Sequence, residues 1–470
     1  MNEMKILNYK KSIIFPLAAY IFLLFANYMR VSIGTPFCFD DCHEYISAMG
    51  VPWKGLLHQL VVTWRSWAVP AFFWWFGPYD LRTAQEIVVT QSIMYFIAWV
   101  FFAYSVSLWL ARTFLGRVIG FVLLCPFVYV KGYYHFNQLL LSDSFALSMV
   151  LVTFSLCLQF SLYIRSRGSL FGIFAPLYVI AIVCSGALMV GARDSSILLG
   201  FCCAFFVMVV NWGDVSSRWY RLAACVLLLG VGGVQAHWAA KRHLVNAENI
   251  LVGFALANPE VRSFFLAHGM PPEVAEGSET FIQQPWSAVN VQQMLEYRQR
   301  VEKNSQFQSF MPQFDKIYSK YVLSHPMDYV KWSAKNTKTI FVDNFQFPHK
   351  SSAIFPRFDT EIPPIIGRDI RLPFVDSSRG LILCGFVFFL YLVCLGFRRV
   401  SVLPLCIVVV GALSALSGFW GDLWECSEMM RHAAIGSIIV RVGFALALIT
   451  MLDMLIALVG RRARAALHSA

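Results

Sequence analysis

Residues 87–111 read IVVTQSIMYFIAWVFFAYSVSLWLA, a run that contains no Asp, Glu, Lys or Arg. A helix needs about 20 mainly apolar residues to cross the hydrocarbon core of a bilayer, so this run is long enough to be a membrane span. Similar runs recur along the 470-residue chain, of which 58% is hydrophobic and 14% charged. A soluble core cannot use so much apolar surface, and the sequence therefore predicts a polytopic α-helical membrane protein.

Ten apolar runs predict about ten transmembrane helices, each roughly 18 residues or longer except for one shorter run. The windows are 12–32, 87–111, 138–164, 169–190, 195–212, 221–239, 378–397, 402–420 and 434–459, with the shorter run at 116–131. An even number of spans places both termini on one side of the membrane. The first window follows Lys10 and Lys11 and lacks a small-residue cleavage site, so we expect a retained helix and not a removed signal peptide.

The net charge of +11 is unevenly distributed over the ten-span arrangement. Basic residues gather in the loops of one face: Lys5, Lys10, Lys11, Arg112, Arg117, Arg165, Arg167, Arg218, Arg221, Arg398, Arg399, Arg461, Arg462 and Arg464. Short cytoplasmic loops retain Lys and Arg, which predicts a multi-pass protein of the plasma (inner) membrane with both termini in the cytoplasm. No basic stripe is interleaved with aromatic residues, so we expect membrane lipid as a partner and no nucleic acid.

The predicted spans divide the chain into three parts. These are an N-terminal transmembrane module at 1–239 with a large first external loop at 33–86, an extracytoplasmic domain at 240–376, and the C-terminal transmembrane helices at 377–470. The domain inserted before the last three spans is long enough to fold by itself. Apolar residues spaced by three and four predict that it is mainly helical, with helices over 287–305 and 308–340.

The first external loop carries an acidic cluster, Phe39-Asp40-Asp41-Cys42-His43-Glu44-Tyr45. Adjacent carboxylates are costly to keep near hydrocarbon, which makes this cluster a candidate functional site. Asp41 and Tyr45 are four positions apart and share a face if the segment is helical. Cys38 and Cys42 permit a disulfide, a metal pair or unpaired thiols, and the sequence leaves these alternatives open. The Trp-rich stretch 64–75 in the same loop suits a helix lying in the membrane interface.

Three more charged groups are predicted on the same external side. Asp143 lies where the fourth span begins, Arg193-Asp194 lies between the fifth and sixth spans, and Glu428 precedes Arg431-His432 at the start of the tenth. Each has a structural alternative: an aspartate can cap a helix, Arg193 and Asp194 can form a local ion pair, and Arg431-His432 can anchor at headgroups. Together, carboxylates for base chemistry and Arg and His for phosphate predict an acid-base and anion-binding site.

Several of these residues carry a resemblance to a known family. Asp41-x-x-x-Tyr45-x-x-Ala48 resembles the Asp-x-x-x-Tyr-x-x-Ala pattern of membrane glycosyltransferases with the C-type fold (GT-C). The segment from Arg65 to Pro70 is similar to their Arg-x-x-x-x-Pro segment, and Asp143 lies where they have an acid, commonly Glu. Glu428-Met429-Met430-Arg431-His432 resembles their late Glu-x-x-Arg-aromatic stretch, with His in place of Tyr, and Tyr321–Tyr329 resembles a His-Pro segment of bacterial relatives.

The resemblance implies an inverting transfer of a sugar from a polyprenyl-phosphate donor to a hydroxyl of a lipid-linked or wall glycan acceptor, outside the membrane, in cell-envelope polysaccharide biosynthesis. By this resemblance we expect Asp41 as the base, Asp40 as its assistant, and Asp143 as the residue that orients the acceptor, an arginine or a metal. A divalent cation (Mg or Mn) is possible, with Asp40 and Asp143 as its ligands. The substrate- and phosphate-binding candidates are Arg65, Arg193, Arg431, His432, Tyr45 and Glu428.

Two other classes of membrane protein fit the composition. A flippase or transporter of lipid-linked oligosaccharide predicts repeats or broken helices with charges at mid-membrane. The predicted spans are read as free of charge apart from Asp453, near a cytoplasmic end. An O-antigen polymerase or ligase would place its key residues in the large external loop. Loss of sugar transfer in Asp41→Asn with unchanged expression would favour the transferase.

Overall fold

The structure is a computed structural model. It describes residues 3–33, 36, 45–55, 66–138, 140, 142–166, 171–209, 214–241, 251, 255–256, 258–276, 299, 303–335, 378–396, 400–422 and 427–469. These residues form helices, turns and irregular segments, and no strand occurs among them.

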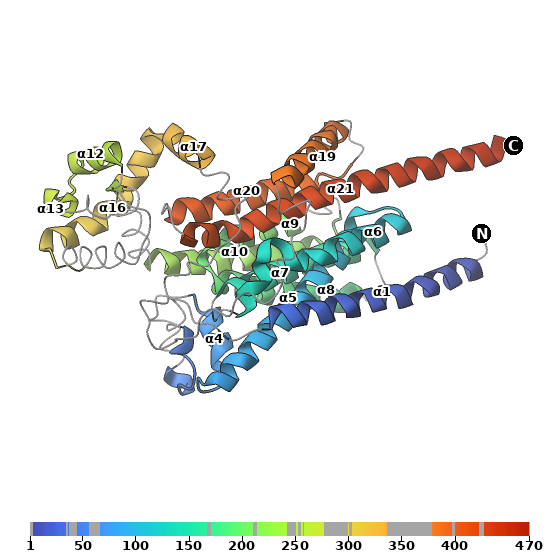
Figure 1. The fold of residues 1–470 in the computed structure, drawn as a ribbon, viewed down its shortest axis with the longest axis horizontal. Coiled ribbons are helices and arrows are strands. Elements are labelled where there is room, and N and C mark those ends of the chain that lie inside the picture. The colour runs from blue at the N-terminus through green and yellow to red at the C-terminus, as the bar shows by residue number, and fades with distance from the viewer. Residues whose placement is uncertain are drawn as a thin grey trace.

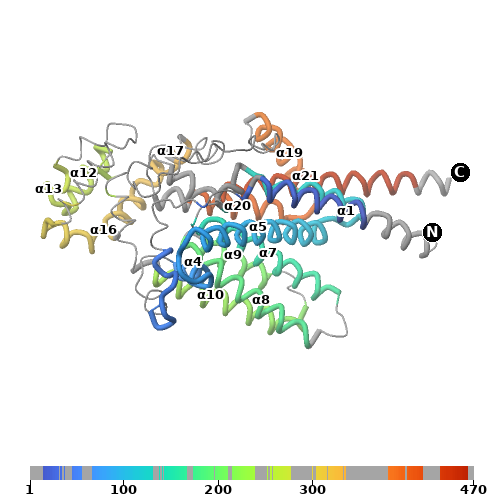
Figure 2. Tube along the Cα trace, turned by 60° about the horizontal axis from the view of Figure 1, so that its bottom comes forward, coloured from blue at the N-terminus to red at the C-terminus, as the bar shows by residue number. Residues whose placement is uncertain are grey.

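Long helices lying side by side form an elongated bundle (Figure 1). They are α1 (Glu3–Ser32), α5 (Leu81–Leu110), α7 (Ser142–Ser166), α8 (Phe171–Ala192), α9 (Ile197–Val209), α10 (Arg218–Lys241), α19 (Ser378–Gly396), α20 (Leu403–Asp422) and α21 (Ser427–Ser469). We call the end of the bundle that carries residues 259–335 the outer end. We call the opposite end, toward which the first turns of α1 and the last turns of α21 extend, the inner end (Figure 1 and Figure 2).

Within the described residues, six helices are long and apolar enough to cross a membrane: Leu81–Leu110, Ser142–Ser166, Ile173–Ala192, Arg218–Trp238, Arg379–Gly396 and Ile435–Ala463. Shorter apolar helices occupy Ile14–Arg30, Phe114–Val130, Ile197–Val209 and Leu403–Leu416. Every apolar window predicted from the sequence overlaps one of these segments. The architecture is that of a helical membrane protein.

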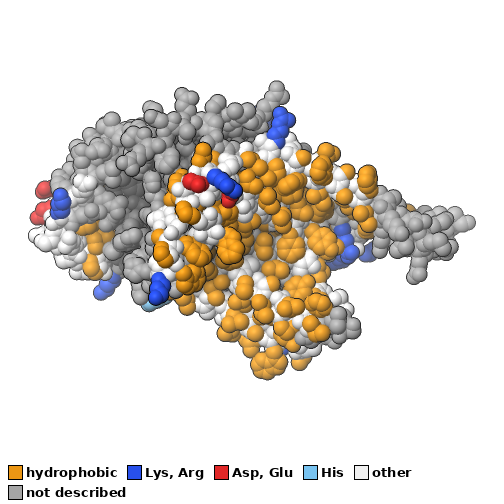
Figure 3. Space-filling view, turned by 90° about the horizontal axis from the view of Figure 1, so that it is seen from below, with side chains coloured by type: hydrophobic (Ala, Val, Ile, Leu, Met, Phe, Trp, Pro, Cys, Tyr) orange, Lys and Arg blue, Asp and Glu red, His pale blue; other side chains and the backbone are white. Residues whose placement is uncertain are grey.

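The surface of the bundle matches this composition. Large apolar side chains face outward along its length, for example Ile97 and Ile180, each 58% exposed. Figure 3 shows hydrophobic side chains covering most of one described face of the bundle. An exposed apolar surface of this extent is expected for contact with lipid and not for contact with water.

The short apolar run at 116–131 forms α6 (Phe114–Leu124), which continues into the 3₁₀ helix η1 (Cys125–Gln138). Thr113 caps α6, because its hydroxyl accepts a hydrogen bond of 2.9 Å from the backbone N–H of Gly116. The change from α-helix to 3₁₀ helix halfway along this segment carries Asn137 toward the start of α7. The predicted helix is therefore confirmed. The apolar pattern did not predict that its second half is a 3₁₀ helix.

Helices α20 and α21 pack with their backbones in contact. A Cβ atom placed on Gly436 would lie 2.1 Å from the backbone nitrogen of Ala415, and one on Gly411 would lie 2.7 Å from the backbone nitrogen of Val440. Small residues at such positions let membrane helices approach closely and gain dispersion contacts, since lipid provides no hydrophobic drive for their association. This contact fixes the position of α21 in the bundle.

The described part of the domain predicted at 240–376 has a core of its own. Its helices are α12 (Pro259–Ala267), α13 (Pro272–Ala275), α16 (Ser305–Ser324) and α17 (Pro326–Lys335). Phe265 and Phe314 are fully buried between α12 and α16, and Ala415 of α20 belongs to the same apolar cluster. The domain therefore rests on the outer end of α20.

One predicted helix of this domain is interrupted. The apolar spacing predicts a continuous helix over 308–340, but α16 ends at Ser324 and α17 begins at Pro326. His325 has φ −129° and ψ 50°, because the proline that follows disfavours helical geometry in the residue before it. The other predicted helix, 287–305, lies almost entirely outside the described residues.

The described part of the first loop includes the short helix α4 (Ala68–Trp74). The Trp-rich stretch was predicted to lie in the interface plane, and α4 instead buries Val69 and Phe73 completely against the bundle. Trp75, which follows α4, is 81% exposed, and Trp53 is 58% exposed. Among the described residues of the first loop, Trp75 at the end of this stretch and Trp53 ahead of it therefore offer exposed indole rings, which are typical of a membrane interface.

Candidate functional site

A buried ion pair lies at the outer end of the bundle. Asp143 lies in the first turn of α7 and is 0% exposed, and Arg193 directly follows α8 and is 8% exposed. The Nη1 atom of Arg193 contacts Oδ1 of Asp143. Because α7 and α8 are consecutive antiparallel helices, the start of one and the end of the other lie at the same end. The sequence predicted these two residues on one side of the membrane and left Arg193, the acceptor or a metal as the partner of Asp143; in the structure Asp143 contacts Arg193.

Asp194, the residue after Arg193, accepts hydrogen bonds from two other segments of the chain. The Oδ1 atom of Asp194 accepts a hydrogen bond of 2.9 Å from the hydroxyl of Ser66 in the first loop. It accepts another of 2.7 Å from the side-chain amide of Gln235 in α10. The loop between α8 and α9 therefore ties together the first loop, α7 and α10.

A second chain of hydrogen bonds leads from α7 to α1. The side-chain amide of Asn137 donates to the hydroxyl of Tyr28, and the hydroxyl of Ser144 donates to the carbonyl oxygen of the Asn137 side chain. Tyr28 stacks on Tyr95 of α5 with ring centroids 6.1 Å apart and planes at 19°. Tyr28, Asn137 and Ser144 are at most 1% exposed. Ser144 is the neighbour of Asp143, so this chain reaches the ion pair.

We call these side chains the outer polar layer: Tyr28, Ser66, Asn137, Asp143, Ser144, Arg193, Asp194 and Gln235. A polar group buried without a partner costs several kcal/mol near hydrocarbon, roughly 2–7 kcal/mol depending on the reference state. The side chains of this layer form hydrogen bonds and an ion pair with one another, although they come from segments that are distant in the sequence. It is the one place at the outer end where a described carboxylate and a described guanidinium are buried together.

Tyr45, predicted to flank the site, is 3% exposed and packs on α4, its ring centroid 6.0 Å from that of Phe73. The ring centroid of the neighbouring Phe72 lies 4.9 Å from that of Phe145 in α7. Phe145 follows Asp143 by two positions. The aromatic rings of the first loop thus pack directly against the start of α7.

Gly191 lets the first loop approach α8. A Cβ atom on this glycine would lie 2.4 Å from Nε1 and Cε2 of Trp67, a distance that any other residue would have to relieve by moving the ring or the helix. Gly191 precedes Arg193 by two positions. The indole of Trp67 therefore packs on the backbone that presents Arg193.

The remaining predicted site residues are not brought into this geometry. Asp40, Asp41 and Arg65 lie outside the described residues, as do Cys38 and Cys42. Glu428, Arg431 and His432 lie in the first turns of α21, where the backbone is described and the side chains are not. The structure thus joins two of the four charged groups, those of Asp143 and of Arg193-Asp194, and leaves the others as predictions.

The donor set around Asp143 bears on the predicted divalent cation. Asp143 is engaged by Arg193, and a metal ion would have to compete with the guanidinium for that carboxylate. Within the described part of the chain, no group of three or more His, Cys, Asp or Glu side chains converges. Asp40, the other predicted ligand, lies outside that part. Binding of Mg or Mn stays a prediction.

Sequence reasoning missed several polar residues of the bundle. Gln235, Asn137 and Tyr28 were not selected, although a Gln inside an apolar run is a signal in itself, because the bilayer offers its amide no partner. The reading that the predicted spans lack charge apart from Asp453 is wrong. Arg441 lies inside α21, is 1% exposed and donates to the carbonyl oxygen of Ser437 at 3.2 Å and to the Ser437 hydroxyl.

The chain was compared with protein-family models, with curated proteins and with solved structures, and none of these comparisons finds a match. A function can therefore be argued only from the chemistry of the site and the order of the helices.

Proposed function

We propose that this chain is a membrane glycosyltransferase of the GT-C type with ten spans. It would move a sugar from a polyprenyl-phosphate donor to an acceptor hydroxyl on the extracytoplasmic face of the plasma (inner) membrane. The acceptor would be a lipid-linked or wall glycan of the cell envelope. The observation that carries the proposal is the buried pair of Asp143 and Arg193, which lies at the outer end of the bundle against the loop that holds the predicted base.

The chemistry of an inverting transfer explains why such a pair is useful. A base takes the proton of the acceptor hydroxyl, the acceptor oxygen bonds to the anomeric carbon, and the bond from that carbon to the phosphate oxygen breaks. The electron pair leaves with the lipid phosphate, whose negative charge a guanidinium can bind through two parallel hydrogen bonds. We assign the base role to Asp41, the phosphate role to Arg193, and to Asp143 the role of positioning Arg193.

Helix order supports the proposed orientation. Within the described residues, ten helical segments overlap the predicted windows, and six of them meet both the length and the hydropathy of a membrane span. The described basic residues Arg112, Arg117, Arg165, Arg218 and Arg221 lie at helix ends on the inner side of the bundle, and α4 and the described helices within 259–335 lie at the outer end (Figure 1). With the inner end in the cytoplasm, the arrangement satisfies the rule that cytoplasmic loops retain Lys and Arg.

A flippase or transporter of lipid-linked oligosaccharide is the second candidate, and one observation favours it. Arg441 is buried within an apolar helix, and an intramembrane charge marks a substrate or ion pathway in many transporters. An O-antigen polymerase or ligase, the third class that fits the sequence, has no described feature in its favour.

The test is sugar transfer by the purified full chain in nanodiscs, with a panel of polyprenyl-phosphate sugars and product identification by mass. We expect Asp41→Asn to lower the rate at least about a hundredfold, the usual scale for loss of a general base. Glu260→Gln, at an exposed acid in the first turn of α12, is the matched control and should retain the wild-type rate. Unchanged transfer in Asp41→Asn, or lipid translocation without transfer by the wild type, would contradict the proposal.

A further inference from the structure

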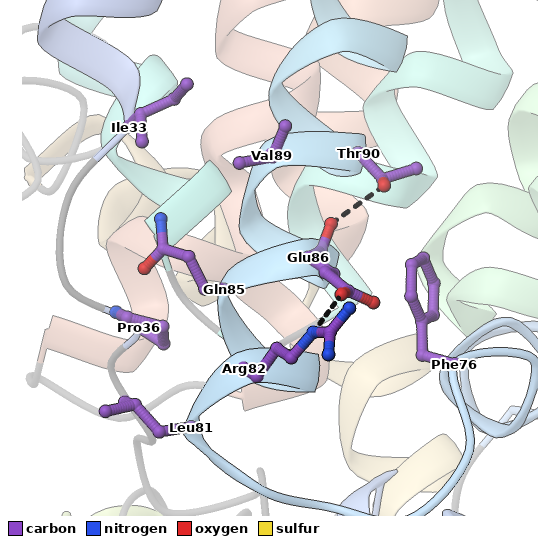
Figure 4. A pocket seen from close by; sticks show the side chains of 9 residues that line it. All are labelled: Ile33, Pro36, Phe76, Leu81, Arg82, Gln85, Glu86, Val89 and Thr90. Carbon is purple, nitrogen blue, oxygen red and sulfur yellow. Dashed lines mark hydrogen bonds and ion pairs between the residues drawn. The ribbon is translucent and has the colours of Figure 1, made fainter.

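A groove opens between the end of α1 and the start of α5. Its volume is about 1060 Å³. Ile33, Phe76, Leu81 and Val89 form much of its apolar wall, and Arg82 stands on its rim (Figure 4). The outer polar layer does not use these residues, so the groove is a feature separate from the ion pair.

The groove lies at the level of the lipid headgroups. Helix α5 has 30 residues, whereas about 20 suffice to cross the hydrocarbon core. Its inner end is followed directly by Arg112, a residue expected at the opposite headgroup layer. The first ten or so residues of α5 must therefore extend beyond the hydrocarbon on the outer side. Exposed Trp75 and Tyr79, next to the groove, are the residue types that mark this level.

The rim of the groove offers one cation. The Arg82 side chain is 86% exposed, and its Nε donates to Oε1 of Glu86 at 3.0 Å. A guanidinium has five N–H donors, and this bond uses one of them. Gln85 and Thr90 also line the groove and can hydrogen-bond sugar hydroxyls. Glu86 also lines the groove, so a phosphate on Arg82 would compete with its carboxylate. One guanidinium that is already paired with an acid matches an amphiphile with a single phosphate charge better than a pyrophosphate-linked lipid.

A series of aromatic rings leads from the groove to the start of α7. The ring centroid of Phe76, which lines the groove, lies 5.3 Å from that of Phe72, and the centroid of Phe72 lies 4.9 Å from that of Phe145 of α7. Phe145 is two positions from Asp143, and residues two apart in a helix do not share a face. The groove therefore lies near the first turn of α7, the turn that carries the proposed reaction centre, without contacting the ion pair.

We infer that this groove is where the polyprenyl phosphate of the donor binds on entry, with the isoprenoid chain along Ile33, Leu81 and Val89 and the phosphate on Arg82, before the phosphate passes to Arg193 for the transfer step. The inference rests on the proposed function, since it names the place where the donor lipid of that reaction enters. An annular phospholipid and a pyrophosphate-linked acceptor are the competing occupants, and both are outcomes of the test.

The test is photolabelling of the full chain in nanodiscs of phosphatidylethanolamine and phosphatidylglycerol, with a polyprenyl phosphate that carries a diazirine on its tail. We expect label on peptides that include residues 81–90, displaced by excess polyprenyl phosphate and not by added phosphatidylglycerol. Val89→Trp fills the groove and should reduce this label. Arg82→Gln should weaken binding by about tenfold, the loss expected for one charge-assisted hydrogen bond.

The matched control is Ile97→Trp, which places the same bulk on the same helix at a lipid-facing position 58% exposed and outside the groove. It should keep the wild-type labelling. Equal displacement by phosphatidylglycerol, stronger displacement by a pyrophosphate-linked glycan, or unchanged labelling in Val89→Trp would each overturn the inference.

Two results separate this inference from the proposed function. If the wild type and Val89→Trp transfer sugar at the same rate and label equally, the groove assignment is wrong and the transferase stands. If labelling and competition follow the expectation while no donor gives a product, the groove binds the lipid and the transferase proposal is wrong. Chromatographic monodispersity of each variant excludes misfolding as the cause of lost label.

Discussion

Two aspartates are buried at opposite ends of the bundle, and they meet different kinds of partner. Asp453, 5% exposed in α21, accepts hydrogen bonds from the backbone N–H groups of Arg112 and Thr113 at 2.9 and 3.0 Å and from the Thr113 hydroxyl at 2.5 Å. Asp143 is held by the side chain of Arg193. The first carboxylate satisfies the start of α6, where backbone donors have no helical partner. The second neutralises a cation.

The difference separates a structural acid from a candidate functional one. Backbone donors cannot leave the Asp453 carboxylate without unwinding the start of α6, and Gly116 is packed so closely that a Cβ atom there would lie 2.1 Å from Oδ1 of Asp453. A guanidinium on a loop can exchange its carboxylate for a phosphate with a small movement of one side chain. Burial of an acid in a membrane helix is therefore not enough to indicate a function. The groups that donate hydrogen bonds to the acid must also be known.

The largest effect is expected from breaking the pair of Asp143 and Arg193. Asp143→Asn leaves the guanidinium buried without its charge partner, and removing one member of a buried pair costs about 3–5 kcal/mol. The double variant Asp143→Asn/Arg193→Gln removes both charges and should recover part of that loss. Thermal unfolding of the wild type and of these two variants in nanodiscs measures the loss and the recovery. If the double variant is no more stable than Asp143→Asn, the two residues do not act as a pair.

A smaller effect, and one on stability alone, is expected at the inner end. Asp453→Asn keeps one acceptor oxygen and turns an amide toward the N–H donors of α6, which should cost about 1–3 kcal/mol. Asp453→Ala should cost more, because it removes every acceptor. Sugar transfer per folded molecule should not change in either variant. If either variant lost as much transfer as Asp41→Asn, Asp453 would not be a purely structural acid, and the contrast with Asp143 would be wrong.

The smallest effect is expected at Asp80, an exposed acid that caps α5. Its carboxylate accepts a hydrogen bond from the backbone N–H of Thr83 at 2.7 Å, and chiefly this bond holds its pKa below the usual range. A folded pKa below the unfolded one means that the stabilising effect is present above the unfolded pKa of about 4 and is lost as the pH falls through the folded pKa.

Asn caps a helix as well as Asp does, so Asp80→Asn should unfold near the wild-type temperature at neutral pH and lack this part of the acid sensitivity. Asp80→Ala loses the cap at every pH. Unfolding midpoints measured from about pH 6 to pH 3 bracket the usual aspartate pKa and test both statements. Identical acid sensitivity of the wild type and Asp80→Asn would show that another carboxylate dominates.

The helices of the bundle were predictable from the sequence, and most contacts of its polar groups were not. Each apolar window forms a helix because a segment in lipid must satisfy its backbone hydrogen bonds within itself, a requirement that depends on local sequence. Span order also predicted that Asp143 and Arg193 lie at one end of the bundle, since it places the start of α7 beside the end of α8, but it left a local pair of Arg193 with Asp194 equally open. The break at His325 was readable in retrospect from Pro326.

The sequence by itself determined the class of protein, the positions of its helices and the placement of Asp143 and Arg193 at one end of the bundle. Only the tertiary structure decided that Asp453 caps α6 across 340 residues, that Ser66 and Gln235 meet on Asp194, and that Arg441 is buried within α21. The physical reason is that a helix closes its hydrogen bonds within a few residues, whereas the partner of a buried side chain depends on which distant segments pack beside it.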